Sequence, residues 1–211
     1  RMNRPPGETQ YCVTDWNNLV KATRELPNLK GYSCVAGIDF SKTDDFVAAG
    51  LLFKVGDQRY WLHHTWVCTK SRDLPRIRYP LKEAEEAGVL TMVNDVEISP
   101  KLIVEWLKEM AKLYIIEGVV MDNFRQTLFR DELKIGFSYE KKNLKLIRPS
   151  DVMKVAPVIG YVLSKELIAW GTCPIMRWYM WNVKAVTDKK GNVDYQKIEP
   201  RSRKTDGAMA W

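Results

Sequence analysis

Three short apolar runs that follow one another early in the chain limit the fold more than any other feature. They cover residues 33–40, 46–53 and 59–68, are rich in β-branched and aromatic residues, and are separated by short polar segments. Runs of this length are typical of strands, and polar turn segments between them favour antiparallel pairing. The sequence therefore predicts a sheet that begins with three antiparallel strands.

Helical and strand-like segments alternate in the rest of the chain. The pair Ser99-Pro100 predicts the start of a helix that reaches about residue 114, because serine caps helices and proline suits their first turn. Further helices are expected over 15–26, 81–87, 123–133 and 150–165, and further strands over 89–96, 118–122 and 144–148. Segments 176–187 and 193–198 flank a Gly-Asn turn and predict a β-hairpin, and a last helix is expected from Asp206. This order predicts an α/β fold: a mixed sheet, with three antiparallel strands and then parallel strands, flanked by helices and followed by an extra β-hairpin near the C-terminus.

Composition narrows the class of partner. The chain has 211 residues, which suits one domain, and a net charge of +7 that favours an anionic partner, nucleic acid before a membrane surface. No apolar run reaches the length of a membrane-spanning helix, so no membrane partner is expected. The four cysteines form no C-x-x-C pair, which argues against a structural zinc site and for free thiols.

Three acidic residues occupy positions where a carboxylate needs an explanation. Asp39 and Asp122 each end an otherwise apolar strand, and Asp206 opens the last expected helix. A buried carboxylate without a partner is costly, and a hard divalent cation is one group that offsets its charge. Carboxylate-held Mg²⁺ or Mn²⁺ pairs cleave phosphodiesters. The pattern alone leaves a second interpretation open, in which Asp39 begins a turn and Asp206 caps a helix.

Several segments resemble one known family. Residues 37–48 (GIDFSKTDDFVA), 119–125 (VVMDNFR) and the closing stretch from Asn182 to Ala208, which contains RKTDGA, resemble the nuclease domain of the large terminase subunit of tailed bacteriophages. The resemblance spans nearly the whole chain. It implies a ribonuclease-H-like fold in which Asp39, Asp122 and Asp206 converge as catalytic residues on two Mg²⁺ or Mn²⁺ ions, with Asp45 as a further metal ligand.

The same resemblance implies residues that contact DNA. Lys197 and Lys204 match basic positions near the family's last acid, where they would neutralise the scissile phosphate. Lys189 and Lys190 lie in the expected hairpin, which would run beside the DNA and contact phosphates. Arg125 is a further candidate because it follows Asp122 by three residues.

The resemblance also sets the expected biological context. It implies cleavage of concatemeric double-stranded DNA in the host cell cytoplasm, at the portal of the viral procapsid, with an ATPase domain, a small terminase subunit and the portal as partners of the full-length protein. The chain begins without Met and contains no G-x-x-x-x-G-K-[ST] motif. We therefore expect an excised fragment, with residues 1–31 as an arm from an absent ATPase domain and residues 32–211 as the nuclease domain.

Two departures and two alternatives accompany this interpretation. Trp170 stands where many relatives carry a histidine, and the helix that begins at Asp206 is shorter than in the family. One alternative is another nuclease of this fold, such as a junction resolvase or a transposase-like core. The other is a DNA-binding module without catalysis, in which the acids are structural. Substrate preference distinguishes another nuclease of this fold from a terminase nuclease. A Mn²⁺ titration distinguishes a binding module from a metal-dependent enzyme.

Overall fold

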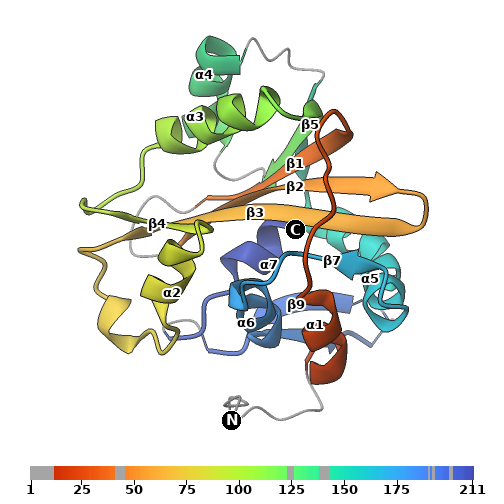
Figure 1. Cartoon of the computed structure of the whole chain (residues 1–211). Helices are drawn as coiled ribbons and strands as arrows, with labels where there is room; N and C mark the ends of the chain where they lie inside the picture. The colour runs from red at the N-terminus through yellow and green to blue at the C-terminus, as the bar shows by residue number, and fades with distance from the viewer. Residues whose placement is uncertain are drawn as a thin grey trace.

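A computed structural model of the chain describes residues 12–40, 46–122, 126–137, 143–189, 191, 193–199 and 202–211 (Figure 1). Its strands are β1 (Ser33–Asp39), β2 (Val47–Val55), β3 (Gln58–Cys68), β4 (Leu90–Val93), β5 (Ile115–Asp122), β6 (Leu144–Ile147), β7 (Ile168–Ala169), β8 (Val183–Thr187) and β9 (Val193–Lys197). Its α-helices are α1 (Trp16–Ala22), α2 (Leu81–Glu86), α3 (Pro100–Ala111), α4 (Gln126–Phe137), α5 (Pro149–Ser164), α6 (Ile175–Trp181) and α7 (Asp206–Ala210), and a 3-10 turn, η1, covers Leu74–Arg76.

The main sheet has the mixed topology that the sequence predicts. Its order is β4-β3-β2-β1-β5-β6, and β7 pairs with β3. Strands β1, β2 and β3 form an antiparallel meander, whereas β5 lies parallel to β1 and β6 lies parallel to β5. Strands β8 and β9 form a separate antiparallel hairpin. The ribonuclease-H-like architecture with an extra hairpin is therefore confirmed.

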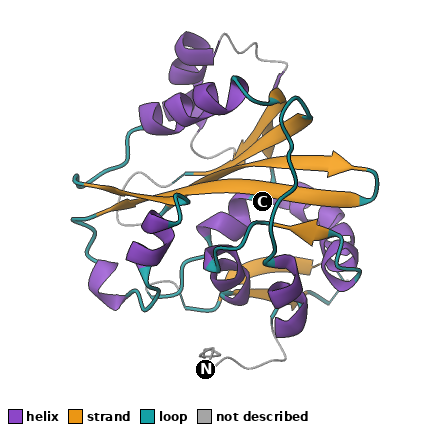
Figure 2. Cartoon of the chain, in the orientation of Figure 1, coloured by secondary structure: helices purple, strands orange, loops and turns teal. Residues whose placement is uncertain are grey.

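Helices cover both faces of this sheet (Figure 2). On one face, α3 and α4 bury Ile103, Leu107 and Phe129 against β1, β2 and β5. On the other face, α1, α2, α5, α6 and α7 pack around Trp61, Trp170 and other large side chains in a second core. Because both faces are covered, strands β1 and β2 are apolar along nearly their whole length.

Local signals explain most of the element boundaries. Ser99 accepts a hydrogen bond from the backbone N–H of Lys101 at 3.3 Å and caps α3, with Pro100 in the first turn, as predicted. Helix α5 begins one residue before the predicted start at residue 150. Pro149 is its first residue, and Asp151 accepts a hydrogen bond from the backbone N–H of Arg148 at 3.1 Å.

The prediction of a strand over 176–187 is wrong in its first half. Residues Ile175–Trp181 form α6, and only Val183–Thr187 form a strand. The aromatic residues of this segment favour strands by propensity. The helix prevails because it buries Ile175, Met176, Tyr179 and Met180, which lie on one helical face.

The expected arm packs closely on the domain over its described part. Helix α1 buries Leu19 and Ala22 in the core beneath the sheet, and the rings of Trp16 and Trp181 meet edge to face with centroids 5.0 Å apart. The backbone carbonyl of Ala22 accepts a hydrogen bond from the N–H of Trp170 at 3.2 Å. A domain boundary at residue 31 stays a prediction.

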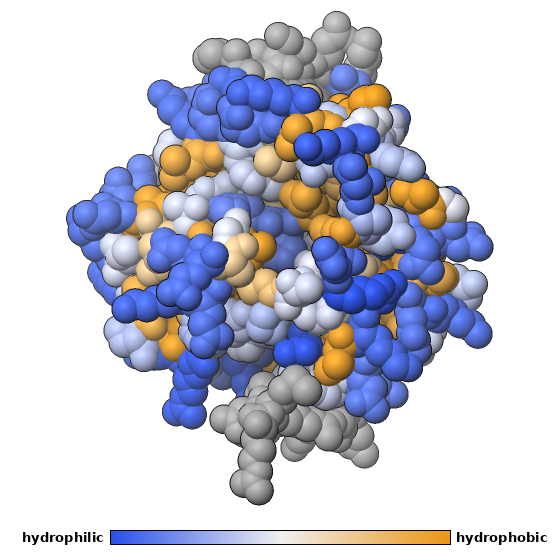
Figure 3. Space-filling model, viewed as in Figure 1, coloured by the Kyte–Doolittle hydropathy of each residue, from blue (hydrophilic) through white to orange (hydrophobic). Residues whose placement is uncertain are grey.

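The surface seen in Figure 3 is mostly hydrophilic, with hydrophobic residues scattered among polar ones. Within the part of the chain that the structure describes, none of the helices combines the length and apolar character needed to cross a membrane. All four cysteines are free thiols, as predicted.

Candidate functional site

Two of the predicted acids lie side by side at one edge of the sheet. Asp39 is the last residue of β1 and Asp122 is the last residue of β5. These strands are parallel neighbours, and their register pairs Ile38 with Met121. Parallel strands end at the same edge of a sheet, so residues 39 and 122 lie next to each other and on the same face.

The third predicted acid comes from a separate helix. Asp206 is the first residue of α7, which contacts β1, β2 and β3. Only 2% of the Asp206 surface is exposed. Asp39 is half-buried and Asp122 is exposed, so Asp206 is the most buried of the three acids. The segment before α7 is fixed by Asn182, whose side-chain amide donates to the carbonyl of Lys204 at 2.8 Å.

Helix α7 approaches the sheet closely because two glycines face it. Gly37 on β1 and Gly50 on β2 are cross-strand partners. A Cβ atom on Gly37 would lie 2.0 Å from the carbonyl oxygen of Ala210, and one on Gly50 would lie 2.3 Å from the ring of Trp61. The absence of side chains at this pair therefore lets the Trp61 ring and the end of α7 rest on the sheet.

The three acids open into one cleft of about 570 Å³. Asp39 and Asp122 contribute from the sheet, Asp206 from α7, and Lys197 from the end of β9. The fold thus brings three carboxylates that are distant in the sequence to the lining of one cleft.

Lys197 lies beside the most buried of these carboxylates. Its ammonium nitrogen is 3.9 Å from Asp206 Oδ1, and about 29% of the Lys197 side chain is exposed. This distance is at the outer limit for an ion pair, so the attraction is modest. Carboxylates that share a cleft repel one another, and Lys197 offsets part of that charge.

The donor set fits a hard divalent cation in its chemistry. Carboxylate oxygens are the ligands that Mg²⁺ and Mn²⁺ prefer. Among the described residues, no group of three or more His, Cys, Asp or Glu side chains is close enough together to form a metal centre. Residues 39, 122 and 206 would therefore have to come closer together to share a cation. Asp45, the further predicted ligand, lies outside the described residues.

The predicted DNA-contacting residues fall in different environments. Lys197 lines the cleft, and Lys189 is exposed in the turn that follows β8. Lys204 is only 2% exposed, and its ammonium nitrogen lies 3.0 Å from Asp73 Oδ2. This ion pair joins the segment before α7 to the loop between β3 and α2. A contact between Lys204 and DNA stays untested, and Lys190 and Arg125 lie outside the described residues.

Two charged residues of the cleft were not singled out from the sequence. Arg148 follows β6 directly and Asp194 lies on β9, and both are exposed. The signal for Arg148 was its place at the end of a strand-like run, the same kind of position that Asp39 and Asp122 hold. No comparable signal marked Asp194.

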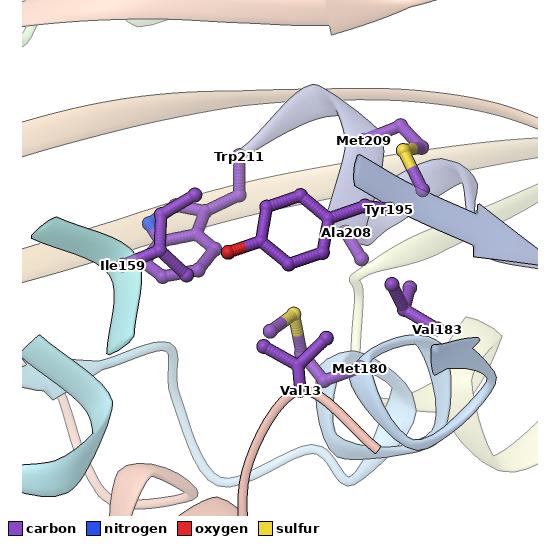
Figure 4. Close-up of a pocket in the computed structure, with 8 residues that line it drawn as sticks. All are labelled: Val13, Ile159, Met180, Val183, Tyr195, Ala208, Met209 and Trp211. Atoms are coloured by element: carbon purple, nitrogen blue, oxygen red, sulfur yellow. The ribbon is translucent and has the colours of Figure 1, made fainter. Parts of the chain in front are cut away.

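The cleft has an apolar wall next to its acids. Ile159, Tyr195, Ala208, Met209 and Trp211 line the cleft and also a small cavity of about 30 Å³ beside it. Figure 4 shows these side chains gathered around this cavity, with Tyr195 between α7 and α5. The Tyr195 hydroxyl donates to the carbonyl of Ala156 on α5 at 3.4 Å. The hairpin, α5 and α7 are thereby held together around the cleft.

The two histidines lie away from this cleft. They point to opposite faces of β3, as neighbours on a strand do: His63 is buried, and His64 Nε2 lies 2.8 Å from Thr91 Oγ1. The pKa of each is lowered to about 4, chiefly by burial, and for His63 also by the charge of His64. Both are therefore neutral near pH 7.

Solved structures of phage large terminases match the fold of this chain over nearly its whole length. The large terminase of bacteriophage HK97 matches 94% of this chain with a TM-score of 0.81 at 18% sequence identity. The large terminase nuclease of the thermophilic phage G20c, in a structure with bound magnesium, matches 96% of the chain with a TM-score of 0.59 at 13% identity. The chain has the fold of a phage large-terminase nuclease domain.

The extent of these matches differs between relatives. The terminase nuclease fold of this chain spans 42% of the HK97 protein and 95% of the G20c nuclease. The G20c nuclease is also known in a structure with bound cobalt, which this chain matches with a TM-score of 0.56 at 11% identity. No family model matches the chain, and no curated protein matches it.

Proposed function

We propose that this chain is the metal-dependent endonuclease domain of a viral DNA-packaging terminase. The observation that carries the proposal is that Asp39, Asp122 and Asp206, from three separate elements, line one cleft. The terminase nuclease fold and the net charge of +7 support it further. Magnesium and cobalt in two structures of the G20c nuclease support a divalent cation as the cofactor.

In this proposal four charged side chains of the cleft have defined tasks. Asp39, Asp122 and Asp206 hold two Mg²⁺ or Mn²⁺ ions, and Asp45 is proposed as a further ligand. Once bound, the ions supply a deprotonated water and stabilise the leaving 3′ oxygen. Lys197, 3.9 Å from Asp206, offsets negative charge that builds up on the phosphate during cleavage.

The proposed substrate is concatemeric double-stranded DNA, cut in the cytoplasm of the host cell at the portal of the procapsid. The ATPase domain, the small terminase subunit and the portal are the proposed partners of the full-length protein. Lys189, Lys190, Lys204 and Arg125 are proposed as additional DNA contacts, with Lys204 requiring release from Asp73 before it reaches a phosphate.

Plasmid cleavage in Mn²⁺ tests this function. We expect Asp39→Asn and Asp122→Asn to reduce cleavage at least ~10³-fold, because each removes the charge of a proposed ligand and leaves the shape unchanged. Asp131→Asn is the matched control, since Asp131 is an exposed acid on α4, outside the cleft. Full activity in either cleft variant would refute the mechanism.

Two further measurements separate the alternatives. A calorimetric Mn²⁺ titration should give heat that disappears in Asp39→Asn, and no such heat would favour a binding module without catalysis. Faster cleavage of four-way junctions or RNA–DNA hybrids than of linear duplex would favour another nuclease of this fold.

A further inference from the structure

Two cations lie on β6 and directly after it, on the neighbour of the strand that carries Asp122. The register of the parallel pair β5–β6 places Lys145 next to Val120, and Ile147 next to Asp122. Side chains two residues apart on a strand share a face, so Lys145 and Ile147 lie on the face that carries Asp122. Arg148 follows at once and lines the cleft itself.

The sheet order defines where these cations lie relative to the acids. Strands β1, β5 and β6 are consecutive neighbours, and β6 ends the order. Asp39 on β1 and Asp122 on β5 therefore come first across the sheet, and the basic end of β6 comes next. Lys197 reaches the same cleft from β9, so cations of two separate elements flank the acids.

Lys145 and Arg148 have no ion-pair partner among the residues that the structure describes. Both are exposed, and no carboxylate of those residues lies within 4.0 Å of either side-chain cation. The nearby Asp151 is engaged elsewhere: it accepts the backbone N–H of Arg148 at 3.1 Å, and Lys154 Nζ lies 3.7 Å from Asp151 Oδ1.

The charge of Asp151 does not cancel the positive potential at this corner. The backbone hydrogen bond from Arg148 lowers the pKa of Asp151, and the charges of Lys154, Lys145 and Arg148 lower it further. Three cations thus surround one carboxylate, which leaves net positive charge beside the cleft.

We propose that Lys145 and Arg148 bind consecutive phosphates of the DNA strand that enters the cleft, on the side of Asp122 away from Asp39. This inference rests on the proposed nuclease function and adds the path of the DNA backbone. The guanidinium of Arg148 forms two parallel hydrogen bonds to one phosphate, and the ammonium of Lys145 meets the next. Contacts of this kind fix the register of the backbone and carry no sequence information.

DNA binding in Ca²⁺, without cleavage, tests the inference. The affinity of the chain for a fluorescent duplex is measured by anisotropy at several salt concentrations. Each neutralised phosphate adds about 0.9 to the salt slope, which corresponds to about eightfold in affinity at 0.1 M salt. We expect Arg148→Ala and Lys145→Ala each to lose about that factor and about one unit of slope, equally for duplexes of different sequence.

Matched variants give the experiment its controls. Arg130→Ala removes an exposed cation from α4 on the other face of the sheet and should bind like the wild type. Arg148→Lys should recover part of the affinity. In cleavage assays Arg148→Ala should raise KM and leave kcat within a few-fold.

The outcomes distinguish this inference from the proposed function. Wild-type affinity and salt slope in the double variant Arg148→Ala/Lys145→Ala would overturn the phosphate track, even if the chain cuts DNA through its acids. Asp122→Asn should still bind duplex while losing cleavage. If it cuts like the wild type, the nuclease mechanism fails, whatever Arg148 does.

Discussion

Replacing Gly37 by alanine should separate the third acid of the cleft from the other two. In the structure a Cβ atom at this position would lie 2.0 Å from the carbonyl oxygen of Ala210 and 3.2 Å from the ring of Trp61. Real Cβ atoms essentially never come closer than 3.0 Å to a non-bonded heavy atom outside their own residue and its chain neighbours. Helix α7 and strand β1 must therefore move apart by about 1 Å, because a backbone carbonyl has no rotamer with which to avoid the methyl group.

The expected effects follow from that displacement. Overpacking of this kind costs about 1–3 kcal/mol, and for a domain of this size each kcal/mol lowers Tm by about 2–4 °C. Helix α7 carries Asp206, and a shift of about 1 Å in a catalytic group costs about 10²-fold in rate. Under the proposed function we expect plasmid cleavage to fall by that factor and Mn²⁺ affinity to fall with it.

Gly160→Ala provides the matched control for Gly37→Ala. Gly160 lies inside α5, and apart from the helix's own backbone no described atom lies within 4 Å of the place that the added methyl group would take. Alanine is favoured over glycine within a helix by about 0.5–1 kcal/mol, so this variant should melt higher and cut normally. Unchanged Tm, Mn²⁺ affinity and cleavage in Gly37→Ala would refute the close packing of α7 on β1.

Two further predictions concern stability. His63 has a pKa of about 4 in the fold and an ordinary value of 6.5, so between these values the unfolded chain binds more protons. Its share of the free energy of unfolding should fall by about 2 kcal/mol from pH 7 to pH 5. In urea titrations His63→Leu should remove that share and leave the share of His64, whose pKa is lowered in the same way. Asp73→Asn leaves the ammonium of Lys204 buried while its partner at 3.0 Å loses its charge, so it should lower the free energy of unfolding by about 3 kcal/mol. Lys204→Met should lower it less, because Asp73 keeps Arg76 at 3.4 Å as a partner. Equal free energies of unfolding for the wild type and Asp73→Asn would contradict a stabilising ion pair.

The sequence predicts the three antiparallel strands because short apolar runs and polar turns are local signals. It also places Asp39, Asp122 and Asp206 at the ends of their elements, for the same reason. The adjacency of β1 and β5 is different, since their pairing joins segments far apart in the chain. Only the family resemblance indicated that these acids lie in one site.

Lys204 and helix α6 show two different reasons why the local sequence pattern did not give the right answer. Lys204 matches a basic position of the terminase family, yet it is buried and its partner Asp73 lies 131 residues away. Nothing in the neighbouring residues indicates that partner. In α6, the spacing of Ile175, Met176, Tyr179 and Met180 was a helical signal that aromatic propensity outweighed.

The placement of α7 has a consequence for the order in which the domain is made. Every strand of the main sheet is synthesised before Asp206. A nascent chain that has folded its sheet on the ribosome therefore holds two of the three carboxylates, and the third arrives only when α7 emerges and settles on Gly37. Translation itself thus delays completion of the cleft until the surrounding domain has been assembled.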